Sequence, residues 1–89
     1  MNWIERMDEP IEVEAKFLTD GGIQPLAFRW AGRGYEISAI GRQWVQAGER
    51  RFLVMTPDER VFELAFLADA GGWRLRRTPS AFGSRGSTV

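Results

Sequence analysis

The sequence predicts a single all-β domain of about six antiparallel strands in a meander, forming a strongly curled sheet or a small, partly open barrel. Three observations support this prediction. Apolar and polar residues alternate along much of the chain with the period of two that is typical of half-buried strands. Turn-forming glycine, proline and aspartate residues recur at short intervals, and no segment has the spacing of an amphipathic helix. Because 89 residues are the length of one domain, the strands must curl together to bury one face.

The first two strands are expected close to the N-terminus. Residues 11–17 alternate between apolar and charged side chains, and the glycine turn at 20–22 ends this strand. Residues 26–30 alternate in the same way, with Pro25 at the start or the edge of the strand, where its missing N–H group is tolerated. A glycine-containing hairpin turn at 31–34 then leads into the third strand.

The remaining strands follow at similar spacing. The third is expected over 35–45, and Gly41 inside it predicts a β-bulge or a sharp bend, because glycine weakens regular pairing. The fourth covers 51–55. The fifth covers 61–68 and is the most apolar segment of the chain, and a short sixth strand covers 73–78.

The two ends differ from the middle in composition. Residues 1–9 are acidic and are expected to form a flexible N-terminus ahead of the β domain at 10–78. Residues 79–89 are small, polar and glycine-rich, so a disordered C-terminal tail is expected there. The stability of the fold is therefore expected to come from residues 10–78.

The alternation also predicts which side chains pack together. The expected core consists of Ile11, Val13, Phe17, Leu26, Phe28, Trp30, Tyr35, Ile37, Phe52, Val54, Phe62, Leu64, Phe66, Trp73 and Leu75. The fourth and fifth strands are apolar on their other face as well, which predicts either a second buried layer or an interface for a protein partner or a second copy. The residues expected at such an interface are Leu53, Met55, Val61 and Leu67, with Ala65 among them on the same face.

Composition excludes several classes of protein. The chain has no cysteine and no histidine, so disulfide scaffolds, zinc sites with their usual ligands and triads with an imidazole base are excluded. The longest apolar run, at 64–68, is far shorter than the ~20 residues of a membrane helix, and the acidic start does not match a signal peptide. We therefore expect a cytoplasmic protein with no membrane contact, no cofactor and no metal. Glu12 and Glu14 share a strand face, but neither a nucleophile nor a pocket is expected beside them, so no enzymatic activity and no catalytic residue are expected.

The formal net charge is zero, yet the charges are segregated along the chain. Acidic residues prevail in 1–20, whereas 70–89 contains arginines and no acidic residue. Arginine stacks on bases and binds phosphate in a bidentate manner, and tryptophans are interleaved with the arginines, so a face that binds single-stranded nucleic acid is one hypothesis. Its residues would be Arg29, Arg33, Arg42, Trp44, Arg74 and Arg76. The alternative is that these charges are solvated or form ordinary ion pairs with acidic residues of neighbouring strands.

Several short motifs resemble a family of small, uncharacterised bacterial domains. The motifs are Glu9-Pro10-Ile11-Glu12-Val13, then Phe28-Arg29-Trp30-x-Gly32-Arg33-x-Tyr35, and a later Trp44. The similarity spans residues 9–78, and the connection after Trp44 is shorter here than in the family. Members of this domain-of-unknown-function family are often encoded beside error-prone, translesion DNA polymerases. The resemblance implies a common fold and an accessory role in bacterial DNA damage tolerance, and it carries over no catalytic residue.

Two hypotheses about function remain open. In the first, the domain is a non-enzymatic interaction module that acts through protein–protein contact. In the second, it binds single-stranded nucleic acid through the arginine and aromatic face. Only the second hypothesis requires the arginines to converge on one face of the fold.

Overall fold

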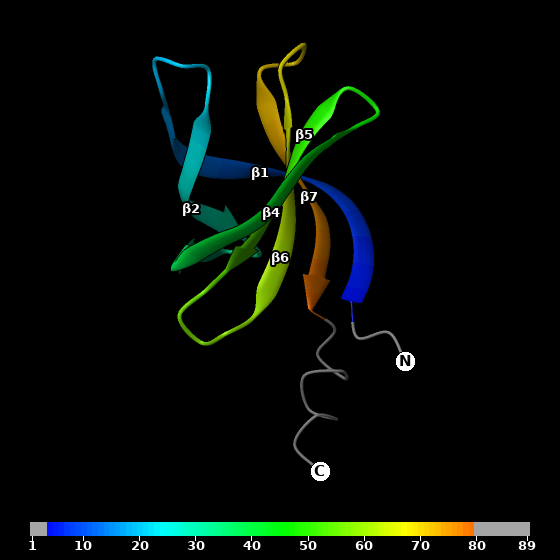
Figure 1. Ribbon diagram of the computed structural model, residues 1–89. Coiled ribbons are helices and arrows are strands. Elements are labelled where there is room, and N and C mark those ends of the chain that lie inside the picture. The colour runs from blue at the N-terminus through cyan, green and yellow to red at the C-terminus, as the bar shows by residue number, and fades with distance from the viewer. Residues whose placement is uncertain (1–3, 80–89) are drawn as a thin grey trace.

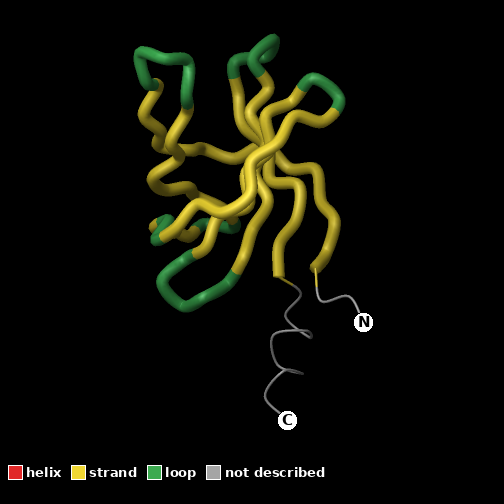
Figure 2. The backbone as a smooth tube through the Cα atoms, in the orientation of Figure 1, coloured by secondary structure: helices red, strands yellow, loops and turns green. Residues whose placement is uncertain are grey.

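The computed structural model describes the backbone of residues 4–79 and the side chains of residues 7–79. Within this range the chain forms seven β-strands and no helix (Figure 1, Figure 2). The strands are β1 Ile4–Phe17, β2 Ile23–Trp30, β3 Arg33–Glu36, β4 Ala39–Gln46, β5 Glu49–Met55, β6 Val61–Leu67 and β7 Gly72–Pro79. Every paired strand is antiparallel to its neighbour. The all-β, antiparallel fold class predicted from the sequence is confirmed.

The seven strands form one sheet in the order β3-β2-β1-β7-β6-β5-β4. Strands that are consecutive in the chain are neighbours, except β3 and β4, which lie at the two edges. β1 is the longest strand, and it bends so that its first half, up to residue 11, pairs with β7 while residues 12–17 pair with β2. Figure 1 shows this bend in the dark blue strand. The result is a strongly curled sheet that forms half of a barrel.

The third predicted strand, 35–45, is divided between the two edges of the sheet. The N–H group of Ile37 donates to the carbonyl oxygen of Leu26 on β2 at 3.0 Å. The N–H group of the next residue, Ser38, donates to the carbonyl oxygen of Met55 on β5 at 2.7 Å. Because successive peptide groups of an extended chain point to opposite sides, this short step changes the pairing partner. It also brings the two edges of the curled sheet together.

A β-bulge bends β4 where the sequence predicts one. The register shifts between Ile40 and Gln43, so that Gly41 and Arg42 together lie opposite Leu53. The bulge predicted at Gly41 is confirmed. Bulges increase the local twist of a strand, and this one curves β4 across the neighbouring strands in Figure 1.

A second bulge makes one core prediction wrong. Ala15 pairs with Pro25 while its neighbour Glu14 pairs with Ala27, so Leu26 is an extra residue in β2. The extra residue changes the phase of the alternation, and Leu26 points outward with 39% of its surface exposed. Pro25 is buried in its place.

Phe17 is a further core prediction that is wrong, with 62% of its surface exposed. It is the last residue of β1 and pairs with Ile23, which occupies the buried position at this end of the sheet. The ring of Phe17 meets the ring of Phe66 edge-on, with centroids 5.6 Å apart. Phe17 therefore covers the open end of the core and is not enclosed by it.

The N-terminal boundary predicted at residue 10 is also wrong. β1 begins at Ile4, and the segment up to Glu9 forms part of the sheet beside β7. Met7 packs against the core, and Asp8 binds arginines of β7. The acidic composition of this segment suggested a solvated end, but β7 supplies arginines that bind one of its carboxylates.

The C-terminal boundary of the sheet lies close to the predicted one. β7 continues through Pro79, one residue beyond the predicted end of the domain, and Thr78 is buried. The flexible and disordered ends predicted for residues 1–3 and 80–89 lie outside the described residues.

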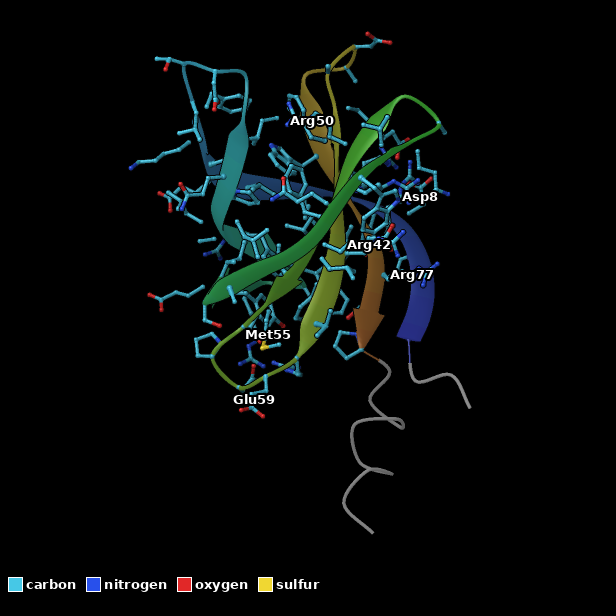
Figure 3. All side chains as sticks on the ribbon, in the orientation of Figure 1. Asp8, Arg42, Arg50, Met55, Glu59 and Arg77 are labelled. Atoms are coloured by element: carbon cyan, nitrogen blue, oxygen red, sulfur yellow. The ribbon has the colours of Figure 1, made fainter. Side chains whose placement is uncertain are left out.

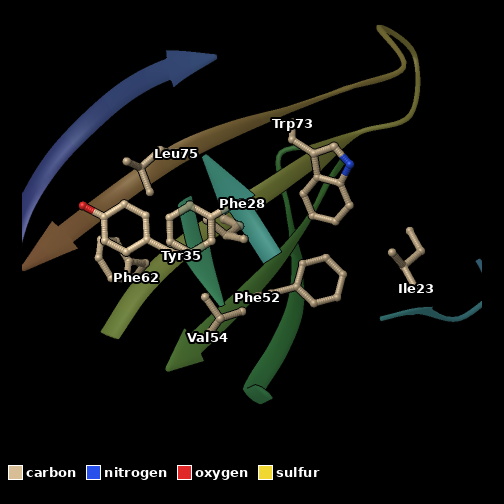
Figure 4. Packing of buried hydrophobic residues seen from close by; sticks show 9 residues of the cluster. Ile23, Phe28, Tyr35, Phe52, Val54, Phe62, Trp73 and Leu75 are labelled. Atoms are coloured by element: carbon tan, nitrogen blue, oxygen red, sulfur yellow. The ribbon is translucent and has the colours of Figure 1, made fainter. Parts of the chain in front are cut away.

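Aromatic side chains fill the core in two adjoining groups (Figure 4). In one group the rings of Phe28 and Tyr35 are stacked with centroids 5.0 Å apart, and Phe62 meets Phe28 edge-on at the same distance. In the other group the ring of Trp73 lies 5.7 Å from that of Phe52. The buried apolar residues are Ile23, Phe28, Tyr35, Phe52, Val54, Phe62, Leu64, Ala65, Trp73 and Leu75. Each large side chain buried here contributes about 1.5–3 kcal/mol, which holds the curled sheet together without disulfides.

Candidate functional site

Seven charged side chains form one network on the outer face of the sheet, across β1, β5, β6 and β7. We call it the outer ion-pair cluster, and its members are Asp8, Glu49, Arg51, Glu63, Arg74, Arg76 and Arg77. Glu63 on β6 lies at its centre with 3% of its side chain exposed. Arg51 donates to one carboxylate oxygen of Glu63 at 2.5 Å, and Arg77 approaches the other at 3.2 Å. The buried charge of Glu63 is therefore compensated from both neighbouring strands.

The other half of the cluster joins β1 to the start of β5. Arg76 binds Asp8 at 2.7 Å and Glu49 at 2.5 Å, and Arg74 also binds Asp8. The hydrogen bond from Arg74 holds the pKa of Asp8 below its ordinary value, more than balancing a smaller effect of burial. Burial works to raise the pKa of Glu49, but the hydrogen bond and charge of Arg76 outweigh it, so this pKa is also lowered. Both carboxylates are ionised at neutral pH.

The arginines predicted to bind nucleic acid do not gather into one cationic surface. Arg74 and Arg76 are bound to carboxylates in the outer ion-pair cluster. Arg33 lies over an aromatic ring of β3, 5.5 Å from its centroid. Arg42 lies over the ring of Trp44 at 5.0 Å, on the strand that crosses the front of the molecule in Figure 3. The structure thus brings Arg42 and Trp44 together and places Arg74 beside Arg76, but the second pair is neutralised.

Arg29 lies in acidic surroundings, as the alternative of charges beside acidic residues of neighbouring strands anticipates. A hollow of about 440 Å³ lies over β1, β2 and β3, where the small residues Ala27 and Gly34 leave space between larger neighbours. The charged residues that line this hollow are Glu12, Glu14, Arg29 and Glu36. The expectation that no pocket adjoins the first two of these glutamates is therefore wrong. With three carboxylates around one guanidinium, the hollow does not resemble a phosphate-binding face.

A second hollow, of about 230 Å³, is apolar and opens on the outer face where β4, β5 and β6 meet. We call it the apolar hollow, and its lining residues are Ala39, Ile40, Gly41, Arg42, Leu53, Val54, Met55 and Val61. Leu53, Met55 and Val61, three of the four residues predicted at a protein interface, meet here. Leu67 does not, because it lies at the other end of β6, paired with Gly72.

The middle of the outer face of β6 is covered. Ala65 is the cross-strand neighbour of Arg51 and Arg74 and is fully buried. The aliphatic stems of arginines can cover apolar surface in this way while their guanidinium groups bind carboxylates. This face is therefore a buried layer around Ala65 and an accessible apolar surface at Leu53 and Met55, where an interface stays a prediction.

Arg42 and Trp44 lie between the apolar hollow and the outer ion-pair cluster. Trp44 pairs in register with Arg51 of the cluster, and its indole N–H donates to the side-chain oxygen of Gln46 at 3.0 Å. Arg42 lines the hollow and stacks on the indole. Among the described residues no carboxylate forms an ion pair with Arg42. Arg42 is thus a positioned cation at the rim of an apolar site.

The acidic members of the cluster escaped the sequence analysis, although one carried a signal. Glu63 is the only charged residue of β6, the most apolar strand. A single carboxylate in such a strand is typical of a buried, paired group. Asp8 and Glu49 carried no such signal, because Arg76, the arginine that they share, is distant from both in sequence.

Comparison with protein-family models, with curated proteins and with solved structures found no match to this chain. In the part of the chain that the structure describes, no helix is long and apolar enough to cross a membrane. Over the same residues, acidic side chains do not gather in a group of three that could hold a metal ion. A functional hypothesis must therefore be built on the geometry of the outer face.

Proposed function

We propose that this domain is a non-enzymatic interaction module that binds another protein through the apolar hollow. The observation that carries the proposal is a contrast on the outer face. The four arginines of the outer ion-pair cluster are all bound to its three carboxylates, whereas apolar side chains from three strands remain accessible in the hollow. Met55 has 37% of its surface exposed there. An accessible apolar site with a polar rim is typical of a protein interface.

The partner that fits carries a large apolar side chain with a carboxylate close to it. Burying one such side chain in the hollow contributes about 1.5–3 kcal/mol. Arg42 lies at the rim and is stacked on Trp44, so a partner's carboxylate can bind it without displacing an existing ion pair. A short extended segment of a protein presents side chains in this arrangement.

The resemblance to domains encoded beside translesion polymerases supports a role for this contact. We propose that the partner segment belongs to a protein of such a polymerase complex in the bacterial cytoplasm. The domain then acts as an accessory factor in DNA damage tolerance, by protein–protein contact and not by chemistry of its own.

Binding of single-stranded nucleic acid is the second candidate, because Arg42 and Trp44 combine a cation with an aromatic platform. Against it, Arg74 and Arg76 are already neutralised. If Arg33 and Arg42 were the phosphate contacts, the log–log salt slope would be about −1.4, at about 0.7 for each contact. A slope of about −2 to −3 for a labelled oligonucleotide would require phosphate contacts from further arginines and would favour this candidate.

The test of the first candidate uses synthetic peptides that carry one leucine or phenylalanine beside one aspartate, including segments of translesion polymerases. Tryptophan fluorescence reports binding to the purified protein. Met55→Glu places a charge in the wall of the hollow, so we expect affinity to fall at least about tenfold. Leu26→Glu is the matched control, since Leu26 is equally exposed but lies on β2 outside the hollow.

Three results would contradict the proposal. Equal loss of binding in Met55→Glu and Leu26→Glu would show that the effect is not local to the hollow. Full binding by Met55→Glu would place the contact elsewhere. If no peptide binds, the partner does not carry an apolar side chain beside a carboxylate, as the proposal requires.

A further inference from the structure

The hairpin that joins β4 to β5 determines which way the peptide groups of β4 point. Its two turn residues, Ala47 and Gly48, both have positive φ angles, 53° and 79°. This is the conformation of a type I′ turn, which connects strands whose last paired residues are directly opposite each other. Those residues are Gln46 and Glu49. In such a hairpin they form a hydrogen-bonded pair, so the N–H and C=O groups of Gln46 point toward β5.

The opposite side of β4 is an unpaired sheet edge. Peptide groups alternate in direction along a strand, so those of Trp44 also point toward β5, whereas those of Gln43 and Val45 point away from it. Among the described residues, no strand pairs with that side of β4. Gln43 is exposed, and Val45 has 70% of its surface exposed. The free hydrogen-bonding groups are therefore accessible.

This edge has few of the features that usually keep sheet edges apart. Exposed edges are commonly protected by lysine, by proline or by charges along the strand. β4 has neither lysine nor proline, and Arg42 is its single charged residue. The bulge at Gly41 lies toward one end and leaves the stretch from Gln43 to Gln46 in regular register.

We propose that β4 pairs antiparallel with β4 of a second copy of this chain, around a two-fold axis at Gln43. In this register the N–H and C=O groups of the two Gln43 residues bond to each other, as a hydrogen-bonded pair requires. Arg42 of each copy then lies opposite Trp44 of the other, on the same face. Each arginine gains an aromatic partner across the interface, and the two arginines do not face each other directly.

The same register also accommodates the exposed apolar side chain of the edge. Val45 of each copy comes opposite Gly41 of the other, where no side chain competes for space. The strand is thus self-complementary from Arg42 to Trp44, and Val45 meets a glycine at the bulge, as a two-fold interface requires. This edge shares Gly41 and Arg42 with the rim of the apolar hollow but binds through the backbone of β4, so it goes beyond the proposed binding of a partner segment.

The test is the oligomeric state of the full chain in solution, measured by light scattering over a range of concentrations. We expect a dimer of twice the 10.1 kDa chain mass. Gln43→Pro removes an N–H group that points to the free edge, so it should leave the monomer fold intact and weaken the dimer at least about tenfold. Gln43→Ala keeps the N–H group and is the matched control, which should remain a dimer.

Hydrogen exchange on the unmodified protein tests the proposal even if Gln43→Pro does not fold. The amides of Gln43 and Val45 should become protected as the concentration rises, while the amide of Gln24 in the interior strand β2 does not change. A monomer at every concentration, or a dimer in which these two amides stay unprotected, would overturn the proposal. Met55→Glu should leave the dimer intact, so failure of this proposal and failure of peptide binding in the hollow are distinguishable.

Discussion

The two halves of the outer face of β5 and β6 share one strand pairing and differ in chemistry. In one half Glu63 lies beneath arginines, and its charge is fully compensated. In the other half Leu53 and Met55 face the apolar hollow. The difference comes from the adjoining strands: β7 supplies long arginines over the first half, whereas β4 supplies Ala39 and Gly41 beside the second. Outward apolar positions therefore stabilise the fold where long side chains cover them and are available for binding where small residues leave them open.

The largest expected effect comes from breaking the charged half at its centre. Glu63→Ala leaves Arg51, which is nearly buried, without its central partner and removes from Arg77 its ion pair with a described residue. Removing one partner of a buried ion pair typically destabilises a protein by about 3–5 kcal/mol, and we expect about 3 kcal/mol because Arg77 is partly solvated. Urea unfolding followed by circular dichroism measures the change.

The control for this variant is Glu14→Ala, which removes an exposed carboxylate from a strand. A change within about 0.5 kcal/mol is expected there. If Glu63→Ala were as mild as Glu14→Ala, the outer ion-pair cluster would be a solvated set of charges, and the contrast between the two halves would disappear.

The charged half should contribute to the acid dependence of stability, as should Asp58 in the turn between β5 and β6, whose pKa is lowered chiefly by a hydrogen bond from Thr56. The folded-state pKa values of Asp8 and Glu49 are lowered, so these groups stabilise the fold in their ionised form. This contribution is complete above their ordinary pKa, about 4, and is lost as the pH falls through the lower folded-state values. We expect constant stability between about pH 7 and 5 and a decline below about pH 4.

Two variants separate the halves in this measurement. Glu49→Gln should lower stability at neutral pH and flatten the decline below pH 4, because one of the groups responsible is gone. Met55→Ser, in the apolar hollow, should keep the acid dependence of the parent protein. An unchanged decline in Glu49→Gln would show that other carboxylates control acid unfolding.

The smallest expected effect concerns the surroundings of the apolar hollow. Removing residues 80–89 should change the free energy of unfolding by less than about 1 kcal/mol, since this segment offers Phe82 as its single large apolar residue. The described chain ends at Pro79 on β7, next to β6, which contributes Val61 to the hollow. A loss of more than about 1 kcal/mol in urea unfolding would mean that the segment contributes to the stability of the fold.

Much of the fold could be predicted because it is encoded locally. Alternation over 26–30 and 51–55 and the turns that separate the strands identify an antiparallel sheet. Gly41 indicates its bulge without knowledge of the partner strand. The core predictions for Leu26 and Phe17 were wrong. Leu26 is the extra residue of a bulge and Phe17 ends its strand, and the residue types around them indicate neither feature.

The candidate site could be predicted only in part. Leu53, Met55 and Val61 stand on neighbouring strands joined by one turn, so their common face follows from alternation. The contribution of Ala39 and Gly41 to the hollow does not, because it depends on how the bulge in β4 aligns with β5. The sequence thus predicts that the residues of the hollow are apolar, but it does not predict that their surface stays accessible.

The sequence by itself determined the class of the fold, the hairpins 51–55/61–67 and 61–67/72–78 and the apolar identity of the residues in the hollow, because each depends on neighbours within a few positions. Only the tertiary structure decided that β1 begins at Ile4 and binds β7, and that Asp8 and Glu49 neutralise Arg76. These pairings join residues far apart in the chain, and they form only when the sheet curls far enough to place β1 beside β7. Alternation along a strand indicates which face of the sheet a side chain occupies. Its ion-pair partner on that face depends on which strands the curled sheet places side by side.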